Sequence, residues 1–233
     1  MDKKYELTSE SITVNGTVLY RVRALKDVPH AKPGELGGYI ESERNLSHDG
    51  HCWVYGNARV YGDADVIGDA KVSGNARVYG YARIVDNAVI TGDVHVCEHA
   101  RISGGAWVGD NAQISEAAWV CGTAWVFGNA RVSGEAKVWE NAQVYENANI
   151  SGTTSTWISG NAHIYGNAKI SGNVEVSECV HVCGDTHVGM DDTHIYIGGS
   201  IKLDRGIWTR SIDICGAKYL LSPTLEKILL DNI

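Results

Sequence analysis

The chain has 233 residues and a net charge of −8, from 28 acidic and 20 basic residues. This balance argues against a general nucleic-acid-binding or membrane-surface protein. Hydrophobic residues make up 44 % of the chain, but 27 residues are Gly and only one is Phe. We therefore expect a core of many small Ala and Val side chains, with the seven Trp outside it.

No apolar segment approaches the length of a bilayer, and the six Cys form no C-x-x-C motif. These observations favour a reduced, cytoplasmic protein without a membrane partner. Nothing in the sequence indicates a cofactor.

Residues 5–23 predict a β-hairpin, because two alternating runs flank Asn15-Gly16, a strong two-residue turn signal. The segment that follows contains Pro29, Pro33 and Gly37-Gly38 and is expected to be irregular. A stack of strands exposes unpaired backbone and apolar surface at its end. We therefore expect this segment to cap the structure that comes next.

A six-residue phrase, Gly-Asn/Asp-Ala-x-Val/Ile-x, then returns seventeen times between Gly50 and Ser151 without a change of spacing. The Ala and the branched residue are separated by one position, so they point to the same side of an extended segment. The Gly-Asn or Gly-Asp pair supplies a corner where positive φ is tolerated. Each unit therefore forms one side of a coil, and stacked coils share one long core.

The spacing changes between Gly152 and Ser159, where eight residues replace six and residues 153–155 are expected to bulge outward. The phrase resumes from Gly160 to Gly189. At three units per turn, the units give between seven and eight coils.

Beyond the phrase, residues 190–215 keep a strand-like alternation. A short C-terminal helix is predicted from Ser222, with Ser as N-cap and Pro223 at the first helical position. Its apolar stripe would serve as a cap or as an oligomer contact.

Three stretches near the start carry a family resemblance, namely Tyr20-Arg21-Val22-Arg23-Ala24-Leu25, Gly34-Glu35-Leu36-Gly37-Gly38-Tyr39-Ile40-Glu41 and Trp53-Val54-Tyr55-Gly56-Asn57-Ala58. They look like a group of proteins encoded by phages and prophages, and the repeat resembles that of the hexapeptide-repeat, left-handed parallel β-helix proteins. The chain departs from the usual phrase by placing Gly two residues after the branched residue.

The resemblance implies an all-β fold, a single-stranded left-handed parallel β-helix with three units per turn. It also implies a homotrimer with parallel helices, located in the host cytosol if a phage encodes it. The expected parts are a hairpin and cap (residues 1–49), the β-helix (50–197), and C-terminal strands with a capping helix (198–233).

With three units per turn, residues eighteen apart stack in adjacent coils, roughly 4.8 Å apart. The exposed fourth positions of the units then form three columns, which we call the first, second and third faces. The first face carries Trp53, Lys71, Val89, Trp107, Trp125, Gln143, His163 and His181, with Phe127 and Tyr145 at adjoining sixth positions. Contiguous exposed aromatic rings indicate a subunit interface, or aromatic stacking that only covers a sheet.

The other two faces carry many basic residues. The second face holds Arg59, Arg77, His95, Gln113, Arg131, Asn149, Lys169 and His187, and the third holds Arg83, Arg101, Trp119, Lys137 and Trp157. Stacking Arg59 on Arg77, or Arg83 on Arg101, costs on the order of 0.8 kcal/mol per pair even in bulk water.

Two explanations of these stacked charges stay open. One is local pairing with corner carboxylates, namely Asp63, Asp69, Asp93 or Glu98. The other is an anionic ligand held by guanidinium groups, with a Trp or Tyr ring stacked beside it. The candidate ligand-binding residues are Arg59, Arg77, Arg83, Arg101 and His95 as anion contacts, and Trp107, Trp119 and Trp125 as an aromatic wall or interface.

The histidines do not indicate a metal or catalytic centre. His163 and His181 are expected to stack, but zinc prefers four ligands and the pattern supplies no third. His95 and His99 fall on a strand and a corner, so they need not converge. We therefore expect no metal site and no catalytic residue.

Three classes of function remain. The first is a non-catalytic protein that binds an anionic small molecule in grooves between subunits, and so sequesters a nucleotide signal of host defence. The second is a coenzyme A-dependent acyltransferase of the hexapeptide-repeat class, with His95 or His163 as general base. The third is a structural or host-protein-binding rod. The sequence favours the first.

Overall fold

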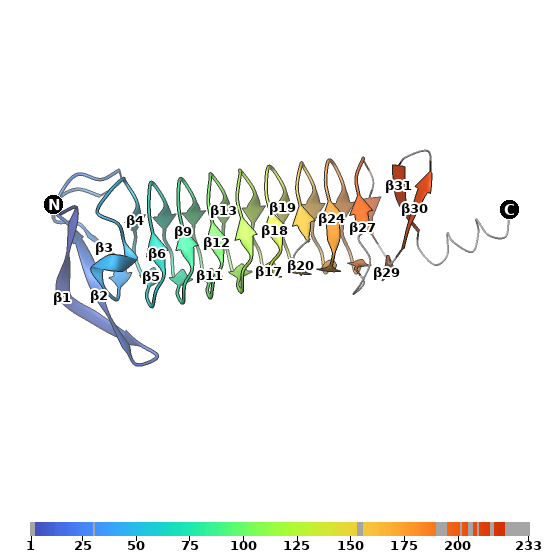
Figure 1. Ribbon diagram of the computed structural model, residues 1–233. Helices are drawn as coiled ribbons and strands as arrows, with labels where there is room; N and C mark the ends of the chain where they lie inside the picture. The colour runs from blue at the N-terminus through green and yellow to red at the C-terminus, as the bar shows by residue number, and fades with distance from the viewer. Residues whose placement is uncertain are drawn as a thin grey trace.

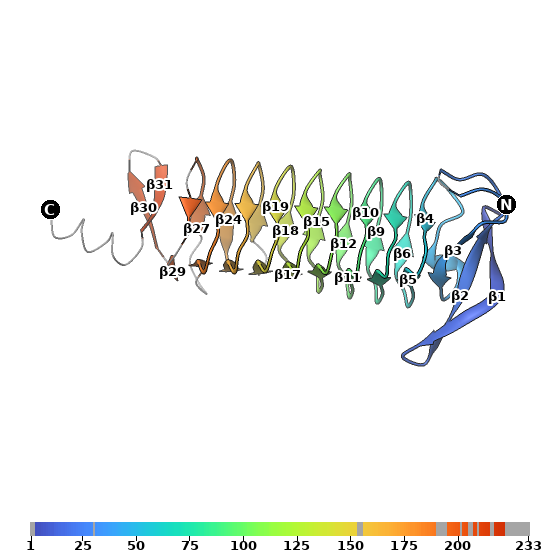
Figure 2. The same cartoon turned by 180° about the vertical axis from the view of Figure 1, so that it is seen from behind.

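The computed structural model describes residues 3–29, 31–152, 156–189, 195–200, 202–204, 207–208, 210–214 and 217–221. The chain forms a straight rod of stacked coils with a long hairpin at its N-terminal end (Figure 1). The view from behind shows the same regular stacking (Figure 2). No helix among the described residues is long and apolar enough to span a membrane.

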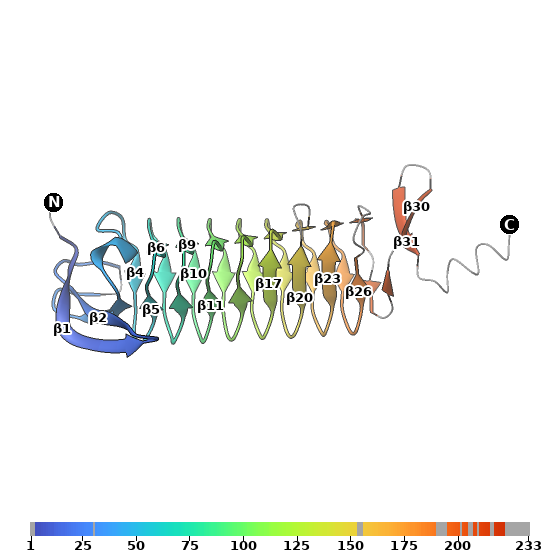
Figure 3. The ribbon, with the colours of Figure 1, turned by 60° about the horizontal axis from the view of Figure 1, so that its bottom comes forward.

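The N-terminal hairpin is confirmed. Strands β1 (Tyr5–Val14) and β2 (Thr17–Ala24) pair in antiparallel fashion around a turn at Asn15 and Gly16, both with positive φ. Strand β2 pairs with β3 (Leu36–Ile40), and β3 then pairs in parallel with the first coil strand of its sheet. The only helical element described is the 3-10 turn η1 (Glu43–Asn45). The hairpin therefore continues one sheet at the N-terminal end of the rod (Figure 3), and it projects from the side of the rod in Figure 1.

Three parallel sheets form the sides of the rod. The first face consists of β4 (Trp53–Val54), β7 (Lys71–Val72), β10 (Val89–Ile90), β13 (Trp107–Val108), β16 (Trp125–Val126), β19 (Gln143–Val144), β22 (His163–Ile164), β25 (His181–Val182) and β28 (Lys202–Leu203). The second face extends β3 with β5 (Arg59–Val60), β8 (Arg77–Val78), β11 (His95–Val96), β14 (Gln113–Ile114), β17 (Arg131–Gly134), β20 (Asn149–Gly152), β23 (Lys169–Gly172), β26 (His187–Val188) and β29 (Ile207–Trp208). The third face consists of β6 (Asp65–Val66), β9 (Arg83–Ile84), β12 (Arg101–Ile102), β15 (Trp119–Val120), β18 (Lys137–Val138), β21 (Trp157–Ile158), β24 (Val174–Val176) and β27 (Ile195–Ile197). A separate antiparallel hairpin, β30 (Arg210–Ile214) and β31 (Ala217–Leu221), follows the last coil.

The register between coils confirms the predicted columns. On the first face Val89 pairs with Trp107 and Trp107 with Trp125, each eighteen residues apart. On the second face Arg59 pairs with Arg77. The parallel β-helix and its three faces are therefore as the repeat predicted.

The longer unit is also confirmed. Lys137 pairs with Trp157, a step of twenty residues, and the spacing returns to eighteen where Trp157 pairs with Glu175. The predicted bulge at residues 153–155 lies outside the described residues, as does the helix predicted from Ser222.

The rod is longer than the repeat count implied. The first face has nine strands, because β28 and β29 still pair in parallel with β25 and β26 after the phrase has ended. The expectation of seven to eight coils was too low, since pairing in a solenoid needs inward apolar residues but not the complete phrase.

The core is a narrow column of small side chains. The inward Ala and Val or Ile of successive units are fully buried from Ala58 to Val182. Backbone amides bond along the rod to carbonyls of the next coil, for example Trp107 N to Ala124 O (2.9 Å) and Gly109 N to Val126 O (2.9 Å). Each residue of a strand is therefore fixed both by its core side chain and by bonds to the neighbouring coils.

Corner positions with positive φ hold either Gly or an acidic residue. Gly74 has a φ of 72°, and a Cβ there would lie 2.6 Å from the Gly92 nitrogen. Seven acidic residues adopt positive φ at equivalent corners, namely Asp86, Glu98, Asp110, Glu116, Glu140, Glu146 and Glu178. All but Glu116 accept a hydrogen bond from the backbone N–H of the stacked corner residue in the next coil, such as Glu146 Oε2 from Gly166 N (2.8 Å). This bond offsets part of the strain of positive φ.

A buried polar network covers the first coil. The Lys4 side chain donates to the carbonyl of Cys52 (2.9 Å), and Tyr5 Oη donates to the carbonyl of Leu46 (2.7 Å). The Asn45 amide donates to the carbonyl of Ala64 (2.8 Å). These bonds satisfy carbonyls that lack a preceding coil.

The expectation that every Trp lies outside the core is wrong at Trp53, which is 1 % exposed. Tyr5 packs edge-on against its ring, with the ring centroids 6.2 Å apart. The N-terminal cap therefore covers an outward position that the repeat alone would leave exposed.

Two neighbouring alanines provide a test of the inward and outward assignment. Ala118 is fully buried and Ala117 is exposed. We expect Ala118→Leu to lower the free energy of unfolding by about 1–3 kcal/mol, because it overpacks the core. Ala117→Leu should change it by less than about 0.5 kcal/mol. Denaturant unfolding followed by circular dichroism measures both, and equal losses would contradict the assignment.

The acidic corners can be tested at Glu146. We expect Glu146→Ala to destabilise the protein by about 1–2 kcal/mol, because it keeps positive φ and leaves the Gly166 N–H without its acceptor. Glu146→Gly loses the same bond but removes the backbone strain, so its loss should be smaller. Denaturant midpoints decide between them; an Ala variant as stable as the Gly variant would argue against strain at this corner.

Candidate functional site

The best candidate for a ligand site lies on the second face, near the N-terminal end of the rod. Arg59 and Arg77 occupy paired positions of β5 and β8. Among the described residues neither guanidinium has an ion-pair partner. The Nε of Arg59 is buried and has no hydrogen-bond partner in the described structure. A buried charged donor without a partner is costly, so this position favours an external anion.

Two tyrosines lie next to these arginines. Tyr61 and Tyr79 follow the same strands at the sixth position of their units, and their rings stack with centroids 5.2 Å apart and an angle of 6°. Burial raises the pKa of Tyr61, and burial together with a hydrogen bond to Cys97 raises that of Tyr79 to about 12. Both phenols therefore stay neutral at physiological pH and offer a flat ring surface beside two positive charges.

His95 continues this column, since it pairs with Arg77. Burial, and then the positive charge of Arg77, lowers the pKa of His95. The ring is therefore mostly neutral at pH 7. It can contribute a hydrogen bond to an anionic ligand but adds little positive charge.

The arginines of the third face are already engaged. Arg83 Nε lies 3.2 Å from Asp65 Oδ1, in the coil before it. Arg101 lies over the ring of Trp119, with its Cζ 5.2 Å from the centroid. Lys137 Nζ approaches the same ring to 4.3 Å, and Trp119 Nε1 donates to Ser103 Oγ (2.8 Å). The Trp119 ring therefore lies between two cations, and both cations already interact with it.

The predicted corner partners of the arginines were wrong. Asp63 pairs with Arg44, Asp69 with His51, Asp93 accepts from Asn75, and Glu98 accepts from a backbone N–H. The carboxylate that does pair, Asp65, sits eighteen residues before Arg83 in the same column. The repeat spacing could have identified it.

The first face carries the predicted aromatic surface, and it is larger than expected. Trp107 lies 5.6 Å from Trp125 and 6.0 Å from Phe127, measured between ring centroids. Phe127, Tyr145 and Tyr165 then stack at 5.0 Å intervals. Trp125 is 49 % exposed. We call Trp107, Trp125, Phe127, Tyr145 and Tyr165 the aromatic surface.

His163 and His181 border the aromatic surface. Their rings stack with centroids 4.7 Å apart and contact Tyr145 and Tyr165 edge-on. Burial, and then the neighbouring His181, lowers the pKa of His163. The described residues contain no group of three or more possible His, Cys, Asp or Glu metal ligands.

The two histidines considered as general bases lack an orienting partner. Neither the His95 nor the His163 ring has a hydrogen bond within the described part of the chain. A catalytic histidine normally needs such a bond to fix its tautomer.

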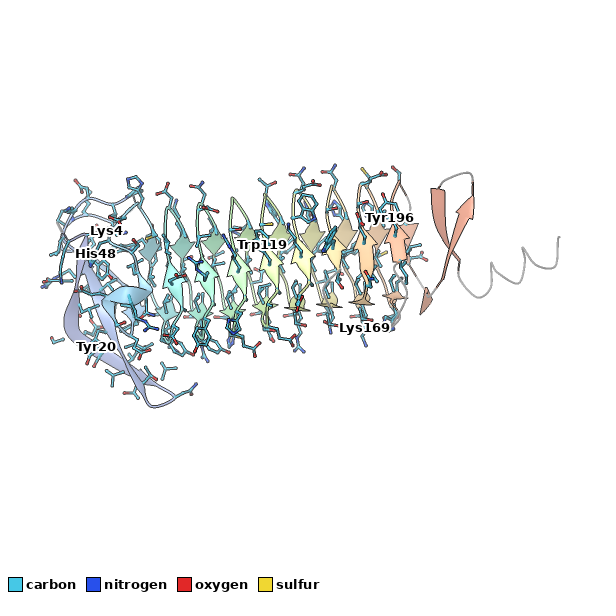
Figure 4. The ribbon with its side chains drawn as sticks, in the orientation of Figure 1. Lys4, Tyr20, His48, Trp119, Lys169 and Tyr196 are labelled. Atoms are coloured by element: carbon cyan, nitrogen blue, oxygen red, sulfur yellow. The ribbon has the colours of Figure 1, made fainter. Side chains whose placement is uncertain are left out.

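The structure therefore separates the predicted site residues. Arg59, Arg77 and His95 lie together on the second face, and the others lie on the first and third faces. Figure 4 shows Trp119 of the third face on a different side of the rod from Lys169 of the second face. Tyr61, Tyr79 and Tyr165 were missed. The same eighteen-residue spacing, applied to sixth positions, would have found them.

Comparison with known protein families gives a short match to a solenoid repeat. The family model described as YdcK Beta solenoid repeat matches residues 70–84, which lie in β7 to β9 and the corners between them. The chain is a β-solenoid repeat protein. No curated protein matches it.

The stacked histidines predict a pH dependence of stability. Because the pKa of His163 is lowered in the folded state, the unfolded chain binds more protons between that pKa and about 6.5. Stability is therefore complete above about pH 6.5 and falls as the pH falls through the folded pKa. We expect His163→Gln, which repeats the Gln143 of the same column, to weaken this fall. Urea midpoints at pH 7.5 and pH 5 test it, and parallel pH profiles would contradict it.

Proposed function

We propose that the protein is a non-catalytic solenoid that binds an anionic small molecule at Arg59 and Arg77. The observation that carries this proposal is the buried, unpartnered Nε of Arg59 beside a second guanidinium without a described counter-charge. An anionic group bound there would supply charge-assisted hydrogen bonds and cancel the repulsion between the two arginines.

The stacked Tyr61 and Tyr79 favour a ligand that combines a phosphate with a planar base. Any of the nucleotide bases can stack on a neutral aromatic ring, because each has a flat π-face. The ligand class we propose is therefore a nucleotide. The resemblance to phage and prophage proteins supports a role in sequestering a nucleotide signal of host defence.

The aromatic surface supports self-association as part of this proposal. Contiguous exposed rings usually mark an interface, and the resemblance to hexapeptide-repeat proteins supports a homotrimer. A trimer would place the second face of each subunit beside a neighbour and enclose the ligand in a groove.

A second candidate is a rod that contacts a host protein. The exposure of Trp125 in the aromatic surface favours it, because aromatic residues are enriched at protein interfaces. A stable complex with a host protein that small anions do not disturb would support this alternative.

Binding can be measured by titration calorimetry with a panel of cyclic dinucleotides and ADP-ribose. We expect at least one to bind, and Arg59→Gln with Arg77→Gln to weaken it at least tenfold, because two charge-assisted contacts are lost. Native mass spectrometry of gently purified protein should show a trimer with a small mass released on denaturation.

Lys32→Gln with Lys202→Gln is the matched control, because both side chains are exposed and the change in net charge is the same. Affinity should be unchanged in this control. No heat with any nucleotide, or equal losses in both double variants, would overturn the proposal.

A further inference from the structure

A hollow on the rod lies along an edge, next to the proposed nucleotide site, since Tyr79 also lines it. A groove of about 930 Å³ follows the corner between the second and third faces. Its floor is a stack of five corner residues, each eighteen residues from the next, namely Gly80, Glu98, Glu116, Gly134 and Gly152. At the spacing of adjacent strands it is roughly 19 Å long.

The groove exists because side-chain size falls abruptly along this corner. At the N-terminal end the rings of Tyr81 and His99 stack with centroids 4.9 Å apart and an angle of 6°. The next residue of the same column is Ala117. Ala117 and the corner glycines Gly134 and Gly152 leave a trough that ends against the stacked rings. Tyr81 is 56 % exposed, so its ring is available to a ligand.

The lining of the groove carries acidic side chains and no basic Lys or Arg among the described residues. The acidic residues are Glu98, Glu116 and Glu135. Glu98 already accepts a bond from the Glu116 N–H (2.6 Å). The carboxylates of Glu116 and Glu135 have no partner among the described side chains or backbone groups. The groove therefore combines free carboxylates with an exposed aromatic stack, a pairing that complements cationic side chains.

We propose that this corner groove binds an extended, basic peptide segment of a partner protein. An extended chain rises about 3.3 Å per residue, so about six residues fill the groove. Alternate side chains of such a segment point to one side, which directs Lys or Arg toward the carboxylates and the Tyr81 ring. A basic occupant also complements the net charge of −8 of the whole chain.

The probe is a fluorescein-labelled peptide of sequence Lys-Thr-Lys-Thr-Lys-Thr, followed by fluorescence anisotropy at low ionic strength. The peptide Glu-Thr-Glu-Thr-Glu-Thr serves as its acidic counterpart. We expect the basic peptide to bind and the acidic one not to bind. Glu116→Gln with Glu135→Gln should weaken binding about five- to tenfold, since each exposed ion pair contributes only modestly.

Ala117→Leu provides a test by shape, because it narrows the groove without changing charge. The position is exposed, so we expect the fold to tolerate the substitution. We expect it to weaken binding at least fivefold. Asp27→Asn with Asp49→Asn is the charge-matched control, since both residues are exposed in the N-terminal cap. This control should bind the peptide within twofold of the native protein.

Four outcomes would overturn the proposal. The first is no binding of the basic peptide, and the second is equal weakening in both double variants, which would show attraction by net charge alone. The third is unchanged binding to Ala117→Leu. The fourth is a changed oligomeric state of Glu116→Gln with Glu135→Gln in sedimentation without peptide, which would assign the groove to contacts between copies of this chain.

Discussion

The backbone bonds between successive coils are the constraint on which the rest of the structure depends. Amides of one coil bond to carbonyls of the next at a fixed register, so each residue stacks on its counterpart one turn later. Surface chemistry is therefore repeated along the rod in columns. Stacked arginines, stacked tyrosines and the ladder of corner amides from Asn111 to Asn167 all follow from this rule. Where a column holds like groups, the protein gains ring contacts or amide bonds. Where it holds like charges, these need a partner, as Arg83 has in Asp65 of the same column.

Part of the negative charge of the chain has a structural origin. Acidic residues at the corners tolerate positive φ because their carboxylates accept the N–H of the next coil, as Asp110 does from Gly128 (3.0 Å). They replace Gly without interrupting the stack. The carboxylates of Glu116 and Glu135 do not take part in such bonds within the described structure. This difference separates charges that hold the coils together from charges that are free to contact another molecule.

Much of the rod could be predicted because its period is local. The spacing of Ala and Val fixed which residues point inward, and the paired columns followed from counting eighteen. The cap could not be predicted in this way, because Lys4 and Asn45 satisfy the first coil through contacts specific to that end. Nor could the corner groove, which depends on side chains of two faces meeting across an edge. The buried Nε of Arg59 likewise depends on packing that no repeat pattern describes. The partner of Arg83 is different, because Asp65 lies in the same column and the eighteen-residue spacing identifies it.

The twenty-residue step from Lys137 to Trp157 shows what the stack tolerates. The coil contains two more residues than its neighbours, and each later side chain stays on its own face. The coil, rather than the six-residue phrase, is therefore the unit by which such a rod can grow or shrink in evolution. Gain or loss of a whole coil changes only the length over which a surface is displayed. Gain or loss of a single phrase would keep the core intact yet turn all later residues by one face, so that His163 would leave the line of Trp107 and Trp125. Selection on the surface thus preserves a count that folding alone would not.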